Sequence, residues 1–316
     1  MNWNVLVTSR SFGTVGSEAV NILKAANIHV DYIQASEFER CIEQYDALII
    51  GAHEFTSDIM RRCNKLKIIC KHGAEIDNIP IKTAQEMGIT VTNAPGVNAN
   101  PVADLAFGLL LTIARQIAYT NKIIHMGQWK TATGTDIYGK TLGLLGFGSI
   151  GKNMAKRAKG FDMKVLAYDL YVNELSYEYS HVKLCGLHEV LQCSDFVSLH
   201  LPLTPNTNQL ISHSAISKMK KGSYLINTAK GEIIDEYALY EALASGHLAG
   251  AAVDVCAVEP IHAESPLLTL DNFIITPHIG VYTKEAIASV SRICAKNIAA
   301  KLCGGSIEFS VTDTKL

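Results

Sequence analysis

Residues 141–169, TLGLLGFGSIGKNMAKRAKGFDMKVLAYD, decide the fold of this chain. The stretch opens with a short apolar run, Thr141–Leu145, which predicts a strand. Three glycines follow, then the helix-forming segment Lys152–Lys159, a second apolar run, Met163–Tyr168, and the acid Asp169. Strand, glycine turn, helix, strand and acid in this order are typical of a dinucleotide-binding βαβ unit.

Each glycine of the turn meets a different requirement of a bound dinucleotide. Gly146 lets the chain turn sharply, Gly148 removes a Cβ that would block the pyrophosphate, and Gly151 lets the helix pack on the strand. Backbone N–H groups at the start of the helix then face the phosphates. The alternative is that these glycines serve tight packing alone. The strand, helix and acid in their expected places favour a cofactor site.

Asp169 predicts which dinucleotide binds. It lies 18 residues after Gly151, close to the separation of about 20 at which a carboxylate accepts hydrogen bonds from the adenosine ribose. A 2′-phosphate would be repelled by this carboxylate, and the next three residues, 170–172, supply no cation. The sequence therefore predicts NAD rather than NADP.

Composition limits the classes of protein and of partner. A length of 316 residues predicts two domains at about 150 residues each. A net charge of −2 argues against nucleic-acid or membrane partners. The eight cysteines form no CxxC pair, no metal-ligand spacing and no disulfide framework, so we expect reduced thiols and no metal site. The first residues show no signal-peptide pattern, and we expect a cytoplasmic protein.

Strand-like runs alternate with helical segments along the whole chain, which predicts an α/β protein with parallel sheets. The turn-rich stretch 93–101 marks the first crossing between domains. The last helix, about 284–302, has no domain of its own to follow it. We therefore expect two doubly wound domains: a flavodoxin-like, discontinuous substrate-binding domain (1–98 plus 285–316) and a Rossmann NAD-binding domain (99–284).

Two further segments carry structural expectations. The apolar stretch 102–118 contains Asp104 and Arg115 and is too short to span a bilayer, which predicts a buried or interface helix. From Gly304 onward we expect a loosely held tail.

Three residues that could carry chemistry follow three successive carboxy-terminal strands. Lys230 can anchor a substrate carboxylate and polarise a carbonyl group. His278 suits general acid/base work because histidine titrates near neutral pH, and Glu259 could orient its ring. Taken singly, a lysine is usually solvated, and a glutamate before proline or a histidine after proline usually belongs to a turn. Their placement at strand ends beside a dinucleotide motif favours function.

These motifs identify a resemblance to a known family. The segments GKTLGLLGFGSIG, VLAYD, SLHLPLTPNT, LINTAKGEIIDE, LAGAAVDVCAVEP and TPHIG occur in the order and spacing of the D-isomer-specific 2-hydroxyacid dehydrogenases. The chain is most similar to the short, phosphoglycerate dehydrogenase-like branch, and the resemblance covers essentially its whole length.

The resemblance implies an architecture and a set of residue roles. It implies a homodimer that uses the long helix near Asp104–Arg115, and an active site between the domains. It also implies that His278 donates the proton when a 2-keto acid is reduced, with Glu259 as its partner and Lys230 as the third catalytic residue. Cofactor contacts are expected from the glycine turn and from the matching motif positions: Gly146, Gly148, Ser149, Ile150, Gly151, Asp169, Leu201, Thr207, Thr228, Ala229, Asp254, His278 and Gly280.

The substrate side departs from the family in two places. The family has arginine where this chain has Lys230, and a flexible point charge lacks the bidentate geometry of a guanidinium group. In KHGAEIDN the family usually has glycine at the position of Glu75, and an acid there would repel an anion unless it turns away or pairs with Lys71 or Lys230. The expected substrate-binding residues are Arg10, Lys71, Ala74, Glu75 and Lys230. Arg10 could equally be an exposed loop residue.

The sequence thus predicts an NAD-dependent oxidoreductase that interconverts a D-2-hydroxy acid and its 2-keto acid. The branch favours 3-phosphoglycerate as substrate, while Lys230 and Glu75 leave open hydroxypyruvate, glyoxylate, or a bulkier or amidated acid. The rival from another class is a non-catalytic, NAD-sensing binding protein, because loss of the arginine is what a decaying active site would show.

Overall fold

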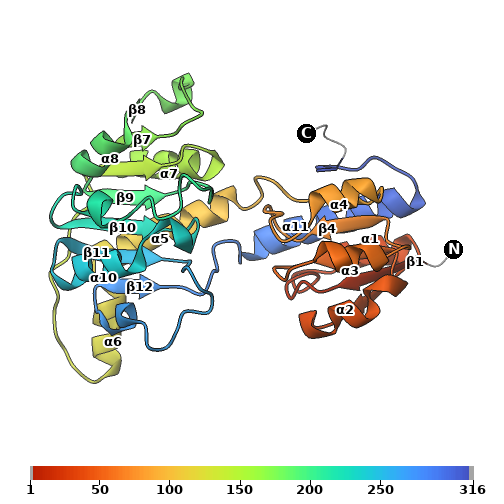
Figure 1. Ribbon diagram of the computed structural model, residues 1–316. Coiled ribbons are helices and arrows are strands. Elements are labelled where there is room, and N and C mark those ends of the chain that lie inside the picture. The colour runs from red at the N-terminus through yellow and green to blue at the C-terminus, as the bar shows by residue number, and fades with distance from the viewer. Residues whose placement is uncertain (1–2, 313–316) are drawn as a thin grey trace. The chain divides into compact units, whose positions relative to one another are not determined.

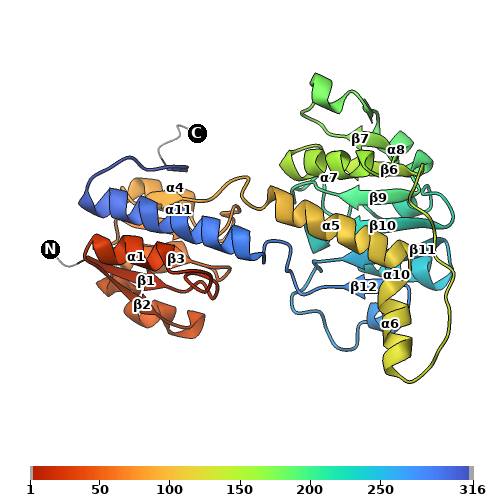
Figure 2. The same cartoon turned by 180° about the vertical axis from the view of Figure 1, so that it is seen from behind.

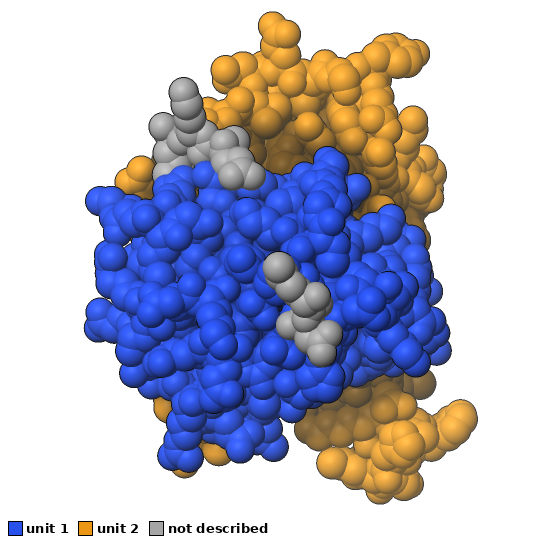
Figure 3. Space-filling view, turned by 90° about the vertical axis from the view of Figure 1, so that its right-hand side faces the viewer, with its two compact units in different colours: residues 1–98, 281–316 blue, residues 99–280 orange. Residues whose placement is uncertain are grey.

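The computed structural model describes residues 3–312. The chain forms two compact units, Met1–Asn98 with Val281–Leu316 and Ala99–Gly280, which are coloured separately in Figure 3. The carboxy-terminal helix α11 (Lys284–Cys303) is part of the first unit. The first unit is therefore built from both ends of the chain.

The first unit contains one five-stranded parallel sheet. The strands lie in the order β2-β1-β3-β4-β5, the order of flavodoxin-like folds. In chain order the elements are β1 (Trp3–Val7), α1 (Glu18–Ala25), β2 (Ile28–Tyr32), α2 (Phe38–Cys41), β3 (Ala47–Ile50), α3 (Ser57–Arg62), β4 (Ile68–Lys71), α4 (Ile81–Glu86) and β5 (Thr90–Thr92).

Both faces of this sheet are covered by helices. Side chains alternate between the two faces along each strand, so neighbouring residues of a strand pack into different cores. Val5 and Val7 of β1 face the core under α1 and α11, where Val290 of α11 is buried. Leu6, between them, faces the opposite core with Phe38. Figure 1 shows α2, α3 and α4 on one face of the sheet, and Figure 2 shows α1 and α11 on the other.

The segment after α11 is held more firmly than the sequence suggests. Asn297, buried in α11, exchanges two hydrogen bonds of 2.9 Å with the backbone of Glu308. Further on, Thr92 of β5 forms an antiparallel bridge with Ser310, and Val311 donates its N–H to the carbonyl of Val91 at 2.8 Å. The expectation of a loose tail from Gly304 is therefore wrong up to residue 312, because the open edge of β5 offers backbone partners.

The second unit contains a seven-stranded parallel sheet in the order β12-β11-β10-β9-β6-β7-β8. This is the doubly wound dinucleotide-binding order with one strand added at the edge. Its elements are α5 (Ala99–Ala114), α6 (Ile117–His125), β6 (Thr141–Leu145), α7 (Ser149–Lys159), β7 (Lys164–Tyr168), β8 (Val182–Leu184), α8 (Leu187–Cys193), β9 (Phe196–Leu199), α9 (His213–Ile216), β10 (Ser223–Asn227), α10 (Glu236–Ala244), β11 (Leu248–Val253) and β12 (Phe273–Ile275). The two sheets confirm the predicted fold class.

Helices cover both faces of this sheet as well. Helices α5 and α7 bury one core with Leu142 and Leu144 of β6, and α8 and α10 bury the other with Leu145. Figure 2 shows α5 and α7 in front of the sheet, and Figure 1 shows α8 and α10 in front of it. Because all seven strands run parallel, their carboxyl ends lie at one edge of the sheet. The strand order reverses between β6 and β9.

The apolar stretch expected to form one helix forms two. Helix α5 ends at Ala114 and α6 begins at Ile117, and Gln116 between them has a left-handed φ of 53°. Over residues 3–312 no single helix is long and apolar enough to cross a bilayer; α5 and α6 reach that length and apolarity only when counted together across a 65° bend.

Candidate active site

The glycine turn after β6 combines two packed glycines with an open one. A Cβ on Gly146, whose φ is 100°, would lie 2.5 Å from the carbonyl oxygen of His200, and one on Gly151 would lie 2.2 Å from the carbonyl oxygen of Gly146. A Cβ on Gly148 would meet no atom of the described residues within 4 Å. Gly148 therefore leaves open surface where a pyrophosphate would lie, while its neighbours hold strand and helix together.

Helix α7 begins directly after this open position. Its N-cap is Gly148, which has no side chain to cap the first turn, and Ser149 is exposed. The first N–H groups of a helix have no intrahelical acceptor, and together they attract anions. The turn thus offers unpaired donors beside an open surface, which fits a dinucleotide phosphate group.

Asp169 at the end of β7 is held in place by two backbone N–H groups. Phe147 of the glycine turn donates to Oδ2 at 2.7 Å, and Tyr171 donates to Oδ1 at 2.8 Å. A carboxylate has about four acceptor sites, so two bonds leave it able to accept from ribose hydroxyl groups. The side chains of Leu170 and Tyr171 that follow are exposed and carry no charge.

The loop after β10 is organised by Asn227, a role that the sequence did not indicate. Its Oδ1 accepts the N–H of Ala229 at 2.9 Å, and its Nδ2 donates to the carbonyl of Lys230 at 2.8 Å. Thr228, on the same loop, has a buried hydroxyl group without a hydrogen-bond partner among residues 3–312. An unsatisfied buried hydroxyl is costly, so this group fits a contact to a bound cofactor. Lys230 itself is half-buried.

Buried Asp254, after β11, fixes the turn that carries His278. Its Oδ1 accepts the N–H of Ile279 at 2.9 Å and the hydroxyl of Thr276, and its Oδ2 accepts the N–H of Gly280 at 2.8 Å. Its backbone carbonyl accepts the N–H of His278 at 3.0 Å. His278 has a left-handed φ of 54°, a conformation that costs energy and that these bonds maintain.

His278 and Glu259 form a hydrogen-bonded pair at the edge of the sheet where the strands of the second unit have their carboxyl ends. Nδ1 of His278 lies 2.9 Å from Oε2 of Glu259, and the two side chains are 52% and 40% exposed. Since a carboxylate only accepts, Nδ1 carries the proton in this bond. The pair therefore presents Nε2 as the nitrogen that can take or give a proton.

The remaining predicted cofactor contacts, Leu201 and Thr207, lie after β9, and their cofactor roles stay predictions. Leu201 is buried in the core, and the hydroxyl of Thr207 bonds within its own turn, to the carbonyl of Pro202 and the N–H of Thr204, both at 2.7 Å. His200 beside them was not predicted. Burial lowers its pKa to about 3, so its ring stays neutral, with Nε2 bonded to Ser198 at 2.9 Å.

The expected substrate residues other than Lys230 belong to the first unit, at the carboxyl ends of its strands. Arg10 is exposed after β1. Lys71 is buried at the end of β4, where its ammonium group bonds to the carbonyl of Gly51 at 2.9 Å and to Oδ1 of Asn78 at 2.5 Å. Ala74 accepts a hydrogen bond from Asn93 at 2.5 Å, and Glu75 is exposed. Lys71 thus joins neighbouring loops, and the substrate roles remain predictions.

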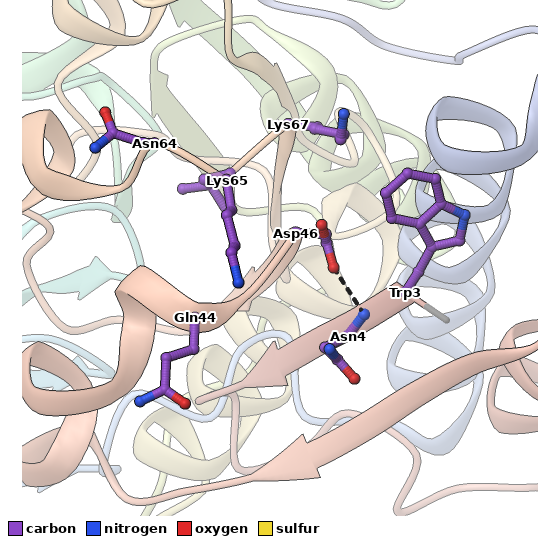
Figure 4. A pocket seen from close by; sticks show the side chains of 8 residues that line it. Trp3, Asn4, Gln44, Asp46, Asn64, Lys65 and Lys67 are labelled. Carbon is purple, nitrogen blue, oxygen red and sulfur yellow. Dashed lines mark hydrogen bonds between the residues drawn. The ribbon is translucent and has the colours of Figure 1, made fainter. Parts of the chain in front are cut away.

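A pocket of about 590 Å³ lies at the opposite edge of this sheet (Figure 4). It opens at the amino ends of β1, β3 and β4, where Lys67 lies 5.2 Å above the ring of Trp3 and Asp46 accepts the N–H of Asn4. Ligands of doubly wound sheets bind at the carboxyl ends, so this pocket is not the candidate site. Within residues 3–312 no group of three His, Cys, Asp or Glu side chains could hold a metal ion.

Comparison with known proteins identifies the family. The sequence profile described as "D-isomer specific 2-hydroxyacid dehydrogenase, NAD binding domain" matches residues 107–280, more than half of the chain. The chain belongs to the D-isomer specific 2-hydroxyacid dehydrogenases. The family assignment confirms the predicted oxidoreductase class, and the cofactor of this dehydrogenase is NAD.

Individual relatives of the dehydrogenase carry different names. It is 44% identical to a hydroxypyruvate reductase of Thermotoga maritima, over 81% of this chain and 84% of that one. It is 41% identical to a D-3-phosphoglycerate dehydrogenase of Methanocaldococcus jannaschii, over 83% of this chain but only 51% of that longer one. A solved structure of a protein from Thermus thermophilus has a TM-score of 0.90 and 34% identity, covering 98% of this chain and 99% of that one.

Proposed function

We propose that this dehydrogenase interconverts a D-2-hydroxy acid and its 2-keto acid, with His278 as the acid/base. The observation that carries the proposal is the 2.9 Å contact between His278 and Glu259, in the same unit as the glycine turn and Asp169. A cofactor site and an oriented imidazole at the ends of one sheet are what an alcohol–carbonyl redox reaction needs.

In this proposal, NAD would be held by the glycine turn and Asp169 and would supply the hydride chemistry at C2 of the substrate, as oxidant of the hydroxy acid or, as NADH, as reductant of the keto acid. His278 Nε2 takes the proton of the C2 hydroxyl group during oxidation and gives it back during reduction. Glu259 keeps the ring oriented through Nδ1. Lys230 holds the substrate carboxylate and polarises the C2 carbonyl group with a single charge.

For the substrate we propose a small 2-keto acid such as hydroxypyruvate or glyoxylate, reduced in the presence of NADH. Relatives named hydroxypyruvate reductase and glyoxylate reductase support this choice, at 44% and 38% identity. The alternative is a D-3-phosphoglycerate dehydrogenase activity, supported by the relative from Methanocaldococcus jannaschii.

Assembly and location are part of the proposal. We propose a homodimer that uses α5, the helix implied by the resemblance, together with α6 and the segment after it, since Ile124, Met126, Trp129 and Tyr138 are exposed large apolar side chains of this region. We also propose a cytoplasmic protein, since all eight cysteines are free thiols.

Steady-state oxidation of NADH against hydroxypyruvate, glyoxylate and 3-phosphohydroxypyruvate tests the proposal. Turnover with at least one acid, reduced about 10²- to 10⁴-fold in His278→Asn, is the expected result. NADH binding without turnover of any 2-keto acid would favour the NAD-sensing binding protein instead.

A further inference from the structure

The turn that carries Glu259 is exposed and needs a support outside itself. Residues 257–259 are all exposed at the surface, after β11 has ended at Val253. Two carboxylates accept backbone N–H groups of this turn. Glu259 accepts from Cys256 at 3.4 Å, and Glu236, from another element, accepts from Ala257 at 2.8 Å. The bond from Glu236 is the shorter of the two and ties the turn to helix α10.

Glu236 is well placed to serve as an anchor, because it is the first residue of α10. That helix is capped by Asp235, whose Oδ1 accepts the N–H groups of Tyr237 and Ala238, both at 3.1 Å. Leu239 and Leu243 of α10 are buried in the core of the unit. A carboxylate in the first turn of a helix is also favoured by the helix dipole. Glu236 therefore extends from a rigid element.

The same peptide group that Glu236 holds is packed against the loop of Lys230. A Cβ on Gly231 would lie 1.9 Å from the carbonyl carbon of Cys256 and 2.3 Å from the nitrogen of Ala257. The Cys256–Ala257 peptide thus lies against Gly231 and donates its N–H to Glu236. Beside it lies a cavity of only about 10 Å³, lined among others by Gly231, Glu236 and Cys256.

We infer that Glu236 is a positioning residue for the reaction: by holding the Ala257 amide it keeps Glu259 aimed at His278 and the Glu259 turn in register with Lys230. The inference rests on the proposed roles of His278 and Glu259. This role requires a side-chain oxygen at position 236 that accepts the Ala257 N–H, and it does not require a charge. Glutamine should therefore preserve the role, and alanine should abolish it.

The test compares Glu236→Ala, Glu236→Gln and the control Glu241→Ala, an exposed glutamate on the same helix. Reduction of hydroxypyruvate by NADH, or of whichever 2-keto acid the enzyme turns over, is followed as kcat and KM over a range of pH. We expect Glu236→Ala to lower kcat by about 10- to 100-fold, the size of effect that small misplacements of catalytic groups produce. NADH binding should stay at the wild-type value, and the unfolding temperature should fall by no more than about 2–4 °C, the size expected for losing the helix-dipole interaction. Glu236→Gln and Glu241→Ala should retain most activity.

The pH profile separates positioning from a general structural effect. In Glu236→Ala the alkaline limb for reduction should move to lower pH, in the same direction as in Glu259→Gln, because both weaken the support of protonated His278. Wild-type kcat and pH profile in Glu236→Ala would overturn the inference, as would equal losses in the alanine and glutamine variants. Full activity of His278→Asn and Glu259→Gln would contradict the proposed function itself, and not only the role of Glu236.

Discussion

Nδ1 of His278 lies 2.9 Å from Oε2 of Glu259, although the two residues are 19 positions apart in the chain and follow two different strands, β12 and β11. Asp254 holds the turn of His278 through three backbone N–H groups and the hydroxyl of Thr276. The orientation of the imidazole is therefore set by the carboxyl ends of β11 and β12 and by the turns that follow them.

The first prediction concerns this pair. His278→Asn should lower kcat for reduction by about 10²- to 10⁴-fold, the usual contribution of general acid/base catalysis. Glu259→Gln should lower it less, because the ring remains but loses its charged partner. Fluorescence titration should show that both variants still bind NADH. A double variant that loses the sum of both effects would indicate that the two residues act independently, which would contradict their role as a pair.

The second prediction distinguishes the glycines of the turn. Gly148→Ala should leave the unfolding temperature unchanged, because its Cβ meets no described atom and its φ of −73° suits alanine. NADH affinity should fall about 10-fold or more, a loss of about 1.4 kcal/mol. Gly151→Ala is the matched contrast. Its Cβ would overlap the Gly146 carbonyl, so it should destabilise the protein by about 1–3 kcal/mol. Tight NADH binding by folded Gly148→Ala would place the pyrophosphate elsewhere.

The third prediction concerns Lys230. Lys230→Arg should raise kcat/KM for glyoxylate and 3-phosphohydroxypyruvate alike, because a guanidinium group can bind the carboxylate that both acids carry with two hydrogen bonds. Steady-state oxidation of NADH with each acid measures the change. Lys230→Met should reduce kcat/KM for every acid, since it removes the charge. Full activity of the methionine variant would exclude Lys230 from substrate binding.

The fourth prediction concerns stability and pH. His72 lies between the hydroxyl groups of Ser11, at 3.3 Å, and Ser291, at 2.9 Å, and burial, with Lys71 nearby, lowers its pKa to about 4. The unfolded chain therefore binds the proton first as pH falls, and stability decreases between about pH 6.5 and pH 4. The loss is at most about 3 kcal/mol.

Urea unfolding at pH 7, 5.5 and 4.5 measures this effect. His72→Gln should flatten the dependence on pH, whereas His29→Gln, a change of an exposed histidine, should leave it as in the wild type. Equal slopes in the wild type and in His72→Gln would show that the loss of stability has another origin, such as His200.

The fold class could be predicted from sequence because its signals are local. Apolar runs of four or five residues, such as Phe196–Leu199, coincide with buried strands, and the glycine turn marks the cofactor strand. The edge strand β8 (Val182–Leu184) was missed, since it is short and only its first residue is buried. The break at Gln116 was missed because apolar residues continue through it, so periodicity alone shows no end of the helix.

The site could be predicted only in part. Residue types and motif positions indicate Lys230, Glu259 and His278, and the structure places Glu259 and His278 in contact. The supports of these residues could not be found in the same way. Asn227, Glu236 and Asp254 act through backbone N–H and carbonyl groups that lie up to 26 residues away, and nothing in the local sequence marks such bonds. His200 likewise owes its altered pKa to burial alone.

The most direct test of the central claim is the fate of the hydride. The protein is incubated with NADH carrying two deuterium atoms at C4 of the nicotinamide and with hydroxypyruvate or glyoxylate, and the product is examined by chiral chromatography and mass spectrometry. We predict a 2-hydroxy acid with one deuterium at C2, of D configuration where C2 of the product is a stereocentre, formed about 10²- to 10⁴-fold more slowly by His278→Asn. An unlabelled or L-configured product, or labelled product formed equally fast by His278→Asn, would contradict the account.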